Sequence, residues 1–128
     1  MCGINGFNWP DQELVKKMNI KLKHRGPDGD GFYVDDQVSL GHARLAILDL
    51  SDKAKQPMAS HNGRYIIVFN GEIYNFAEIK VELSALGHQF ISTSDTEVLV
   101  NAWQEWGPDC LPKLNGIFAF AIWDNQEK

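Results

Sequence analysis

Two segments of this chain are apolar at consecutive positions, where a strand of a half-exposed β-sheet would alternate. Residues 63–70, "GRYIIVFN", contain an unbroken apolar run, and in residues 116–124, "GIFAFAIWD", odd and even positions are both apolar. A strand with one face in water alternates between apolar and polar residues, whereas a strand buried on both faces does not. We therefore expect both strands to be covered on both sides.

Three segments with the helical spacing of apolar residues lie between the expected strands. They begin at Asp11, Asn75 and Ser94, and a glutamate follows three residues after Asn75 and after Ser94, as in a capping box. Each segment ends at a glycine or a Gly-Pro pair, at Gly26–Pro27, Gly87 and Gly107–Pro108.

Shorter segments complete the expected strands, namely residues 2–7, 31–34, 38–48 and 88–93. Helices that alternate with strands buried on both faces predict sheets stacked between helical layers. The strand at 116–124 runs into the polar stretch "DNQEK", and the sequence stops where the partner of this strand should begin. We therefore expect the sequence to be the front part of a longer protein.

Composition and charge argue against several classes of function. A chain of 128 residues with 44% hydrophobic residues is long and apolar enough for one folded domain. Its net charge of −5 argues against nucleic acid as a partner, because such binding needs basic residues that replace counterions. No apolar run approaches the roughly 18 residues of a membrane span, and no signal peptide is apparent, so we expect no membrane contact and a cytoplasmic location.

The cysteines and histidines show no metal-binding pattern. Cys2 and Cys110 are not in CxxC spacing, and the four histidines lack the spacing of metal ligands. We therefore expect no metal and no disulfide framework. Cys110 has the character of a small buried apolar residue.

Cys2 lies directly behind the initiator methionine. After removal of Met1, Cys2 would carry a thiol and a free α-amine on adjacent carbons. An N-terminal amine can act as the base that activates an N-terminal nucleophile. A cysteine at this position without any role is the more common case, so a catalytic function needs support from other residues.

The Asn70–Gly71 pair has two interpretations. Asn-Gly is a frequent tight turn of a β-hairpin, because both residues tolerate positive φ. The pair could instead form an oxyanion hole from the side-chain amide of Asn70 and the peptide N–H of Gly71. The helix start expected at Asn75 leaves little room for a returning strand, which argues against the turn.

Two charged residues also have two interpretations each. Arg44 lies among apolar residues on the same side of a strand as His42, so it is either in a structural ion pair or binds an anionic ligand. Asp95 is close to a helix start, where a carboxylate is favourable, but it could equally bind an ammonium group. These residues alone leave both alternatives open.

Six motifs together resemble the N-terminal glutaminase domain of glutamine-dependent asparagine synthetases. In order, they are "MCGINGF", "HRGPDGDGF", "GHARLAILDLS", "QPM", "FNGEIYN" and "SDTEV". The resemblance spans residues 1–128, which we interpret as a class II glutamine amidotransferase domain whose C-terminal remainder and synthetase domain are absent. It implies an α+β fold of the N-terminal nucleophile hydrolase type, a four-layer αββα sandwich that is incomplete in this chain.

The resemblance also implies roles for individual residues. Cys2 would be the nucleophile that attacks the side-chain amide of glutamine, and Asn70 and Gly71 would form the oxyanion hole. The other implied substrate-binding residues are Arg44 on the α-carboxylate, the backbone of Leu45, Ala46, Ile47 and Leu48 along the pocket, and Glu72 and Asp95 on the α-ammonium side. Arg25 and Asp28 would be scaffold beside the site.

The implied reaction is hydrolysis of glutamine to glutamate and ammonia through a Cys2 thioester. Ammonia would pass to a covalently linked synthetase domain, where ATP and Mg²⁺ would support the conversion of aspartate to asparagine; no cofactor is implied for residues 1–128. One alternative is an amidotransferase with a different carboxylate acceptor. Another is a truncated glutamine-binding module without turnover, which a retained Met1 would favour. The expected small-molecule partner is glutamine, and a homodimer is left open.

Overall fold

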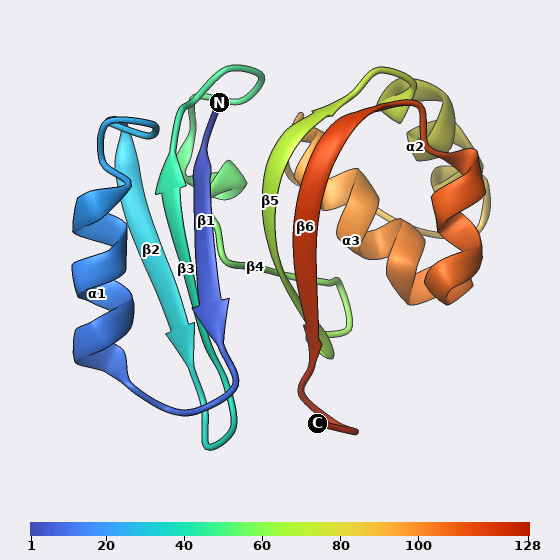
Figure 1. Ribbon diagram of the computed structural model, residues 1–128. Helices are drawn as coiled ribbons and strands as arrows, with labels where there is room; N and C mark the ends of the chain where they lie inside the picture. The colour runs from blue at the N-terminus through green and yellow to red at the C-terminus, as the bar shows by residue number, and fades with distance from the viewer.

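Two three-stranded antiparallel sheets lie face to face in the computed structural model, which describes residues 1–128 (Figure 1). The first sheet has the order β1-β3-β2, with β1 at Gly3–Phe7, β3 at Ser39–Arg44 and β2 at Gly29–Val34. The second has the order β4-β5-β6, with β4 at Met58–Ala59, β5 at Tyr65–Ile73 and β6 at Gly116–Asp124. Every neighbouring pair of strands is antiparallel.

Helices cover the outer faces of both sheets. Helix α1, Gln12–Lys21, packs on the first sheet, and α2, Phe76–Ala85, and α3, Asp95–Trp106, lie on the second (Figure 1). Short 3₁₀ helices span Asp52–Ala54 and Gly107–Lys113. The layers therefore follow the order helix, sheet, sheet, helix, and the expected α+β four-layer sandwich is confirmed. None of the helices is long and apolar enough to cross a bilayer.

Asp11 and Ser94 begin their helices as expected, but the capping boxes are wrong. Asp11 Oδ1 accepts from the N–H of Leu14 at 2.9 Å, and Ser94 Oγ accepts from the N–H of Thr96 at 3.1 Å. Asn75 occupies the cap position of α2 without a capping bond; its side chain donates to Lys113 O and accepts from Asn115 N. Glu97 does not return a bond to Ser94.

The strand expected at residues 88–93 is absent, because a side chain binds this segment instead of a neighbouring strand. Glu97 Oε2 accepts from the N–H of Ile91 at 3.1 Å, and Glu97 Oε1 accepts from the N–H and the hydroxyl of Ser92 at 2.8 and 2.6 Å. The third expected strand is shorter than predicted, since β3 ends at Arg44 and residues 45–48 form a loop.

Most of the core lies between the second sheet and its helices. Residues Ile67, Phe69 and Ile73 of β5 pack there with residues of α2 and α3. A smaller apolar cluster between the sheets contains Val38, Leu40, Ile66 and Val68. Strand β5 is therefore buried on both faces, as predicted.

Strand β6 is not covered on both faces, contrary to the prediction. Phe118, Phe120 and Ile122 pack against the main core, whereas Ile117 is 65% exposed and Ala119 is also exposed. The reason is the edge position of β6: the first sheet packs opposite β5, so the outward face of β6 has no layer above it.

His42 of β3, in the first sheet, contacts β5 of the second sheet. It is 1% exposed, and its Nε2 lies 3.2 Å from the carbonyl oxygen of Phe69. Burial lowers the pKa of His42 to about 4, and the nearby Arg44 adds to this effect, although the bond to Phe69 opposes it. The imidazole is therefore neutral at physiological pH.

Acidification should destabilise this fold before its carboxylates titrate. Because the pKa of His42 is lower in the folded than in the unfolded chain, its stabilising contribution is complete above the unfolded value and is lost as the pH falls toward the folded value. We expect a loss of about 2 kcal/mol between about pH 7.5 and about pH 5, measured by urea unfolding.

A His42→Gln variant is the control for this measurement. Glutamine keeps an N–H donor for Phe69 but does not titrate, so its unfolding free energy should change less with pH across the same range. Parallel pH profiles of the two proteins would contradict the assignment.

Candidate active site

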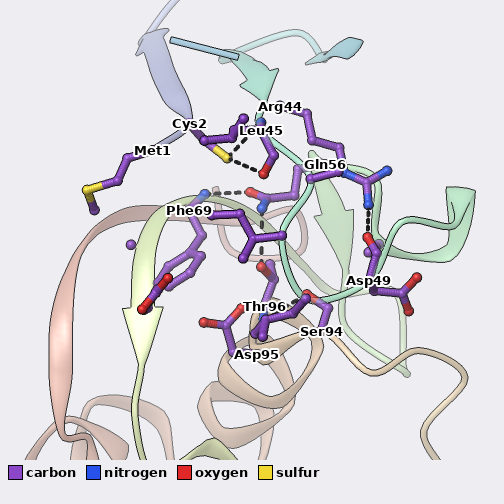
Figure 2. Close-up of a pocket in the computed structure, with 16 residues that line it drawn as sticks. Met1, Cys2, Arg44, Leu45, Asp49, Gln56, Phe69, Ser94, Asp95 and Thr96 are labelled. Carbon is purple, nitrogen blue, oxygen red and sulfur yellow. Dashed lines mark hydrogen bonds between the residues drawn. The ribbon is translucent and has the colours of Figure 1, made fainter. Parts of the chain in front are cut away.

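Cys2 lies where β1 begins, beside the end of β3. Its Sγ accepts from the N–H of Leu45 at 3.2 Å and lies 3.5 Å from Leu45 O (Figure 2). The antiparallel pairing of Gly3 with Ala43 brings the start of β1 and the end of β3 together. Arg25 Nε donates to Cys2 O at 3.2 Å, and Asp28 Oδ2 accepts from Ala46 N at 2.9 Å, so the loop after α1 holds both sides of this contact.

A cavity of about 60 Å³ opens beside the thiol. Of the candidate residues, Cys2, Arg44, Leu45, Ala46, Ile47, Leu48, Gly71, Glu72 and Asp95 line it, and they come from both sheets, the loop after β3 and the start of α3. Met1 also lines it. The structure thus brings nine candidate residues, from distant parts of the sequence, to one cavity.

Arg44 has no carboxylate partner in the structure. It is 9% exposed, its Nη1 donates to Ser51 O at 3.0 Å, and its Nη2 donates to Asp49 O. The alternative of a structural ion pair is therefore wrong, since the partners are neutral carbonyls of the loop that follows β3. Its positive charge remains uncompensated by an adjacent anion at the cavity wall.

Asn70 and Gly71 lie within β5, so the hairpin turn is excluded. Gly71 has φ +151°, and an added Cβ would lie 2.2 Å from Ile117 O, so this position needs glycine. Gly71 lines the cavity, whereas Asn70 is not among the lining residues. The Asn70 Oδ1 is buried without a hydrogen-bond partner.

Asp95 and Glu72 form an acidic wall of the cavity. Asp95 is 6% exposed, and its Oδ2 accepts from the N–H of Ile73 at 3.1 Å. Burial raises the pKa of Asp95, hydrogen bonds from Ile73 and Thr96 oppose this, and the charge of Glu72 raises it further. A cation bound between the two carboxylates would relieve this repulsion.

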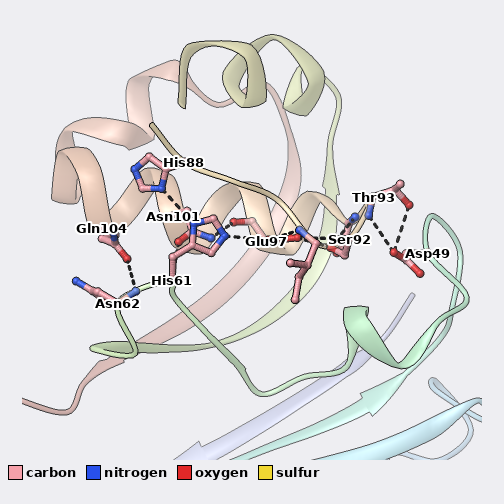
Figure 3. Close-up of polar contacts among 11 residues, drawn as sticks. Asp49, His61, Asn62, His88, Ser92, Thr93, Glu97, Asn101 and Gln104 are labelled. Atoms are coloured by element: carbon pink, nitrogen blue, oxygen red, sulfur yellow. Dashed lines mark hydrogen bonds and ion pairs between the residues drawn. The ribbon is translucent and has the colours of Figure 1, made fainter. Parts of the chain in front are cut away.

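Asp49 fastens the loop after β3 to the segment before α3. Its Oδ2 accepts from the N–H of Thr93 at 2.9 Å (Figure 3). Its Oδ1 accepts from the N–H and the hydroxyl of Ser51 at 2.8 and 2.5 Å. These bonds, first of all that from the Ser51 hydroxyl, hold the pKa of Asp49 well below its ordinary value. Asp49 therefore stays charged and keeps one wall of the cavity closed.

Glu97 supports the same segment from the inside of α3. Besides the bonds to Ile91 and Ser92, its Oε2 lies 2.9 Å from His61 Nε2, and His61 Nδ1 lies 3.3 Å from His88 Nδ1 (Figure 3). Burial raises the pKa of Glu97, but the bonds from Ser92, His61 and Ile91 outweigh it, so the pKa is lowered. The segment before Asp95 is thus bound by charged groups at two points.

The sequence-based prediction missed several lining residues. They are Met1, Asp49, Ala54, Gln56, Phe69, Ser94 and Thr96. Most of them lie within the motifs quoted above, so the signal was present, but nothing in the residue types distinguished them from scaffold. No group of three or more His, Cys, Asp or Glu side chains is arranged to hold a metal ion.

The four-layer αββα fold is that of the N-terminal nucleophile hydrolases, and the Cys2 thiol lies at the N-terminal end of β1. Residues 1–128 match the family model of the glutamine amidotransferase domain, and the chain belongs to this family. It is also similar to solved structures: glutamine phosphoribosylpyrophosphate amidotransferase of Bacillus subtilis, complexed with ADP and GMP, has a TM-score of 0.77 at 21% identity, over 97% of this chain and 35% of that one. At this identity, the likeness concerns the fold alone.

Curated relatives carry a more specific name. Asparagine synthetase [glutamine-hydrolyzing] 3 of Bacillus subtilis strain 168 is 45% identical over 98% of this chain, and asparagine synthetase B of Escherichia coli strain K12 is 40% identical over 99% of it. The chain spans 22% and 24% of the length of these two relatives. It is thus a glutamine amidotransferase domain homologous to the N-terminal part of glutamine-hydrolysing asparagine synthetases.

Removing the Asp49 carboxylate should loosen the loop without unfolding the chain. In an Asp49→Ala variant, we expect amide hydrogen exchange at Ser51 and Thr93 to accelerate roughly tenfold or more, because both amides lose a charged acceptor. An Asp52→Ala variant is the matched control, since that carboxylate is exposed and pairs only with Lys55. Equal exchange rates in both variants would show that Asp49 does not hold the loop.

Proposed function

We propose that this domain hydrolyses the side-chain amide of glutamine to glutamate and ammonia, with Cys2 as the nucleophile. The observation that carries the proposal is the Cys2 sulfur, held by the Leu45 N–H at 3.2 Å beside a cavity with a cationic and an acidic wall. A free amino acid has one anionic and one cationic end. Arg44 suits the α-carboxylate, and Asp95 with Glu72 suits the α-ammonium group.

The proposed reaction needs a free α-amine at Cys2. This amine takes the thiol proton while sulfur attacks the amide carbon, and the Gly71 N–H stabilises the oxyanion that forms. The C–N bond then breaks, the proton passes to the leaving nitrogen, and ammonia departs from a thioester. Water attacks the thioester, releases glutamate and returns a proton to sulfur. Asn70 would join the oxyanion hole if its side chain turned toward the cavity.

Met1 blocks this reaction in two ways. While it remains, the Cys2 nitrogen belongs to a peptide bond and cannot act as a base, and Met1 itself lines the cavity. Removal of Met1 would therefore expose the base and enlarge the small cavity together.

We further propose that ammonia passes to a linked synthetase domain that uses ATP and Mg²⁺ to convert aspartate to asparagine. The names of the relatives at 45% and 40% identity support this acceptor over other carboxylates. Both cysteines are free thiols, and a thiol nucleophile persists best in a reducing compartment, which supports action in the cytoplasm.

Labelling of Cys2 should depend on removal of Met1. We expect the processed chain to react with a diazoketone analogue of glutamine far faster than a chain that retains Met1, because only the former has an adjacent amine. Peptide mass spectrometry identifies the modified residue. Cys110 is the internal control: it is fully buried, and burial raises the pKa of its thiol to about 11. Equal Cys2 labelling of both forms would refute the role of the amine, and a processed Cys2→Ala chain that still hydrolyses glutamine would refute the nucleophile.

An Arg44→Lys variant should weaken glutamine binding although the charge is kept. Arg44 already donates to two loop carbonyls, and a lysine ammonium cannot make these bonds and a planar two-point contact with a carboxylate. We expect KM for glutamine to rise roughly 10- to 100-fold. Arg64→Lys is the control, because Arg64 pairs with Asp124 outside the cavity. An unchanged KM in Arg44→Lys would limit Arg44 to holding the loop.

A further inference from the structure

Strand β5 leaves part of one edge without a neighbouring strand. Its other edge pairs with β6 along all nine residues, but β4 has only two residues and pairs no further than Ile67. Peptide groups that are unpaired and shielded from water are costly, so the groups beyond Ile67 need other partners.

The direction of each peptide group follows from the ladder. The N–H of Tyr74 donates to Asn115 O at 2.6 Å, and the carbonyl of Arg64 accepts from Asn125 N at 3.0 Å. The backbone N–H and C=O groups of the even-numbered residues of β5 therefore point toward β6. Successive residues of a strand alternate in direction. The backbone N–H and C=O groups of the odd-numbered residues, among them Phe69, Gly71 and Ile73, therefore point to the open edge, on the side of the cavity.

Side chains replace the missing strand on both sides of Gly71. Gln56 Oε1 accepts from the N–H of Phe69 at 2.6 Å, and His42 Nε2 lies 3.2 Å from Phe69 O. Asp95 Oδ2 accepts from the N–H of Ile73. The N–H of Gly71, a residue that lines the cavity together with Cys2, is thereby left between two fixed peptide groups.

Both partners of Phe69 are committed to this contact. His42 is 1% exposed and neutral, and because its Nε2 faces a carbonyl oxygen it carries its hydrogen there; its Nδ1 has no partner. Gln56 is 9% exposed and uses its amide nitrogen to donate to Thr96 Oγ1 at 3.2 Å. Gln56 thus ties β5 to the start of α3 as well (Figure 2).

We propose that His42 and Gln56 are positioning residues that fix the Phe69 peptide groups and so aim the Gly71 N–H at the oxyanion of the reaction. They act through β5 and need no bond of their own to glutamine. This inference rests on the proposed glutamine hydrolysis. Since an oxyanion exists only in the transition state and the intermediate, misalignment of its donor lowers kcat more than it changes KM.

Pairs of variants that differ in one hydrogen bond test the proposal. In the chain after removal of Met1, we expect His42→Leu and Gln56→Met each to lower kcat for glutamine by about 10- to 100-fold, with KM within about threefold of the unsubstituted chain. His42→Gln keeps a donor for Phe69 O, and Gln56→Glu keeps an acceptor for Phe69 N–H. These two conservative variants should retain kcat within about threefold to fivefold.

An Asn101→Leu variant controls for general loss of a buried polar group. Asn101 is fully buried, accepts from His61 N and donates to Glu97 O, and lies outside the cavity lining. At a temperature where the variants are folded, as judged by circular dichroism, Asn101→Leu should keep its kcat. His42→Leu removes the bond to Phe69 O, and Gln56→Met removes the bond to Phe69 N–H. Each variant tests the positioning of Phe69, so one of them suffices if the other does not fold.

Iodoacetamide separates failure of this inference from failure of the proposed function. It alkylates a thiol by direct displacement without an oxyanion, so Cys2 in the positioning variants should react as fast as in the unsubstituted chain. Loss of glutamine turnover with unchanged alkylation supports the inference. A folded His42→Leu or Gln56→Met chain with unchanged kcat, or an equal loss in the conservative variants, overturns it. An unsubstituted, processed chain that does not hydrolyse glutamine refutes the proposed function itself.

Discussion

The structure depends on how β5 satisfies its peptide groups after β4 ends. An antiparallel strand has two hydrogen-bonding edges, and here one edge is only partly occupied by a strand. Gln56, His42 and Asp95 supply partners for Phe69 and Ile73 from a loop, from the first sheet and from α3, and the N–H of Gly71 between them stays open to the cavity. The same three bonds therefore join the two sheets and one helix around the cavity. The packing of the domain and the geometry of the site thus depend on the same contacts.

Charge burial imposes the second constraint on the cavity. Arg44 is almost buried without an adjacent anion, and Asp95 is almost buried beside another carboxylate. Each arrangement is unfavourable in the free domain, because a buried charge needs a partner. The bonds of Asp49 and Glu97 hold the surrounding segments in place despite this cost. The proposed amino-acid substrate, with one negative and one positive end, would give each of these buried charges a partner.

Local patterns predicted the starts of the three helices and most strands, because apolar spacing and capping residues are features of the nearby sequence. The end expected for the first helix at Gly26–Pro27 is wrong, since α1 ends at Lys21 and a turn follows. The motifs also named nine residues that line the cavity. The errors came from contacts distant in sequence. Residues 88–93 have strand-like composition but are bound by Glu97, and β6 has two apolar faces but only one covering layer. Gln56 was part of a quoted motif, yet its role depends on the early end of β4, which no sequence pattern indicated.

Alternation along β5 couples the chemistry of the site to the alignment of the second sheet. Asn70 pairs opposite Ala119 and Gly71 opposite Phe118. A slip of the ladder by one residue would exchange the two faces of the strand and move Asn70 into the position where a Cβ meets the backbone of β6. It would also turn the Gly71 N–H away from Cys2 and into the ladder. A misaligned domain would thus be badly packed and, under the proposed function, inactive, so selection for that activity would also select for correct strand alignment.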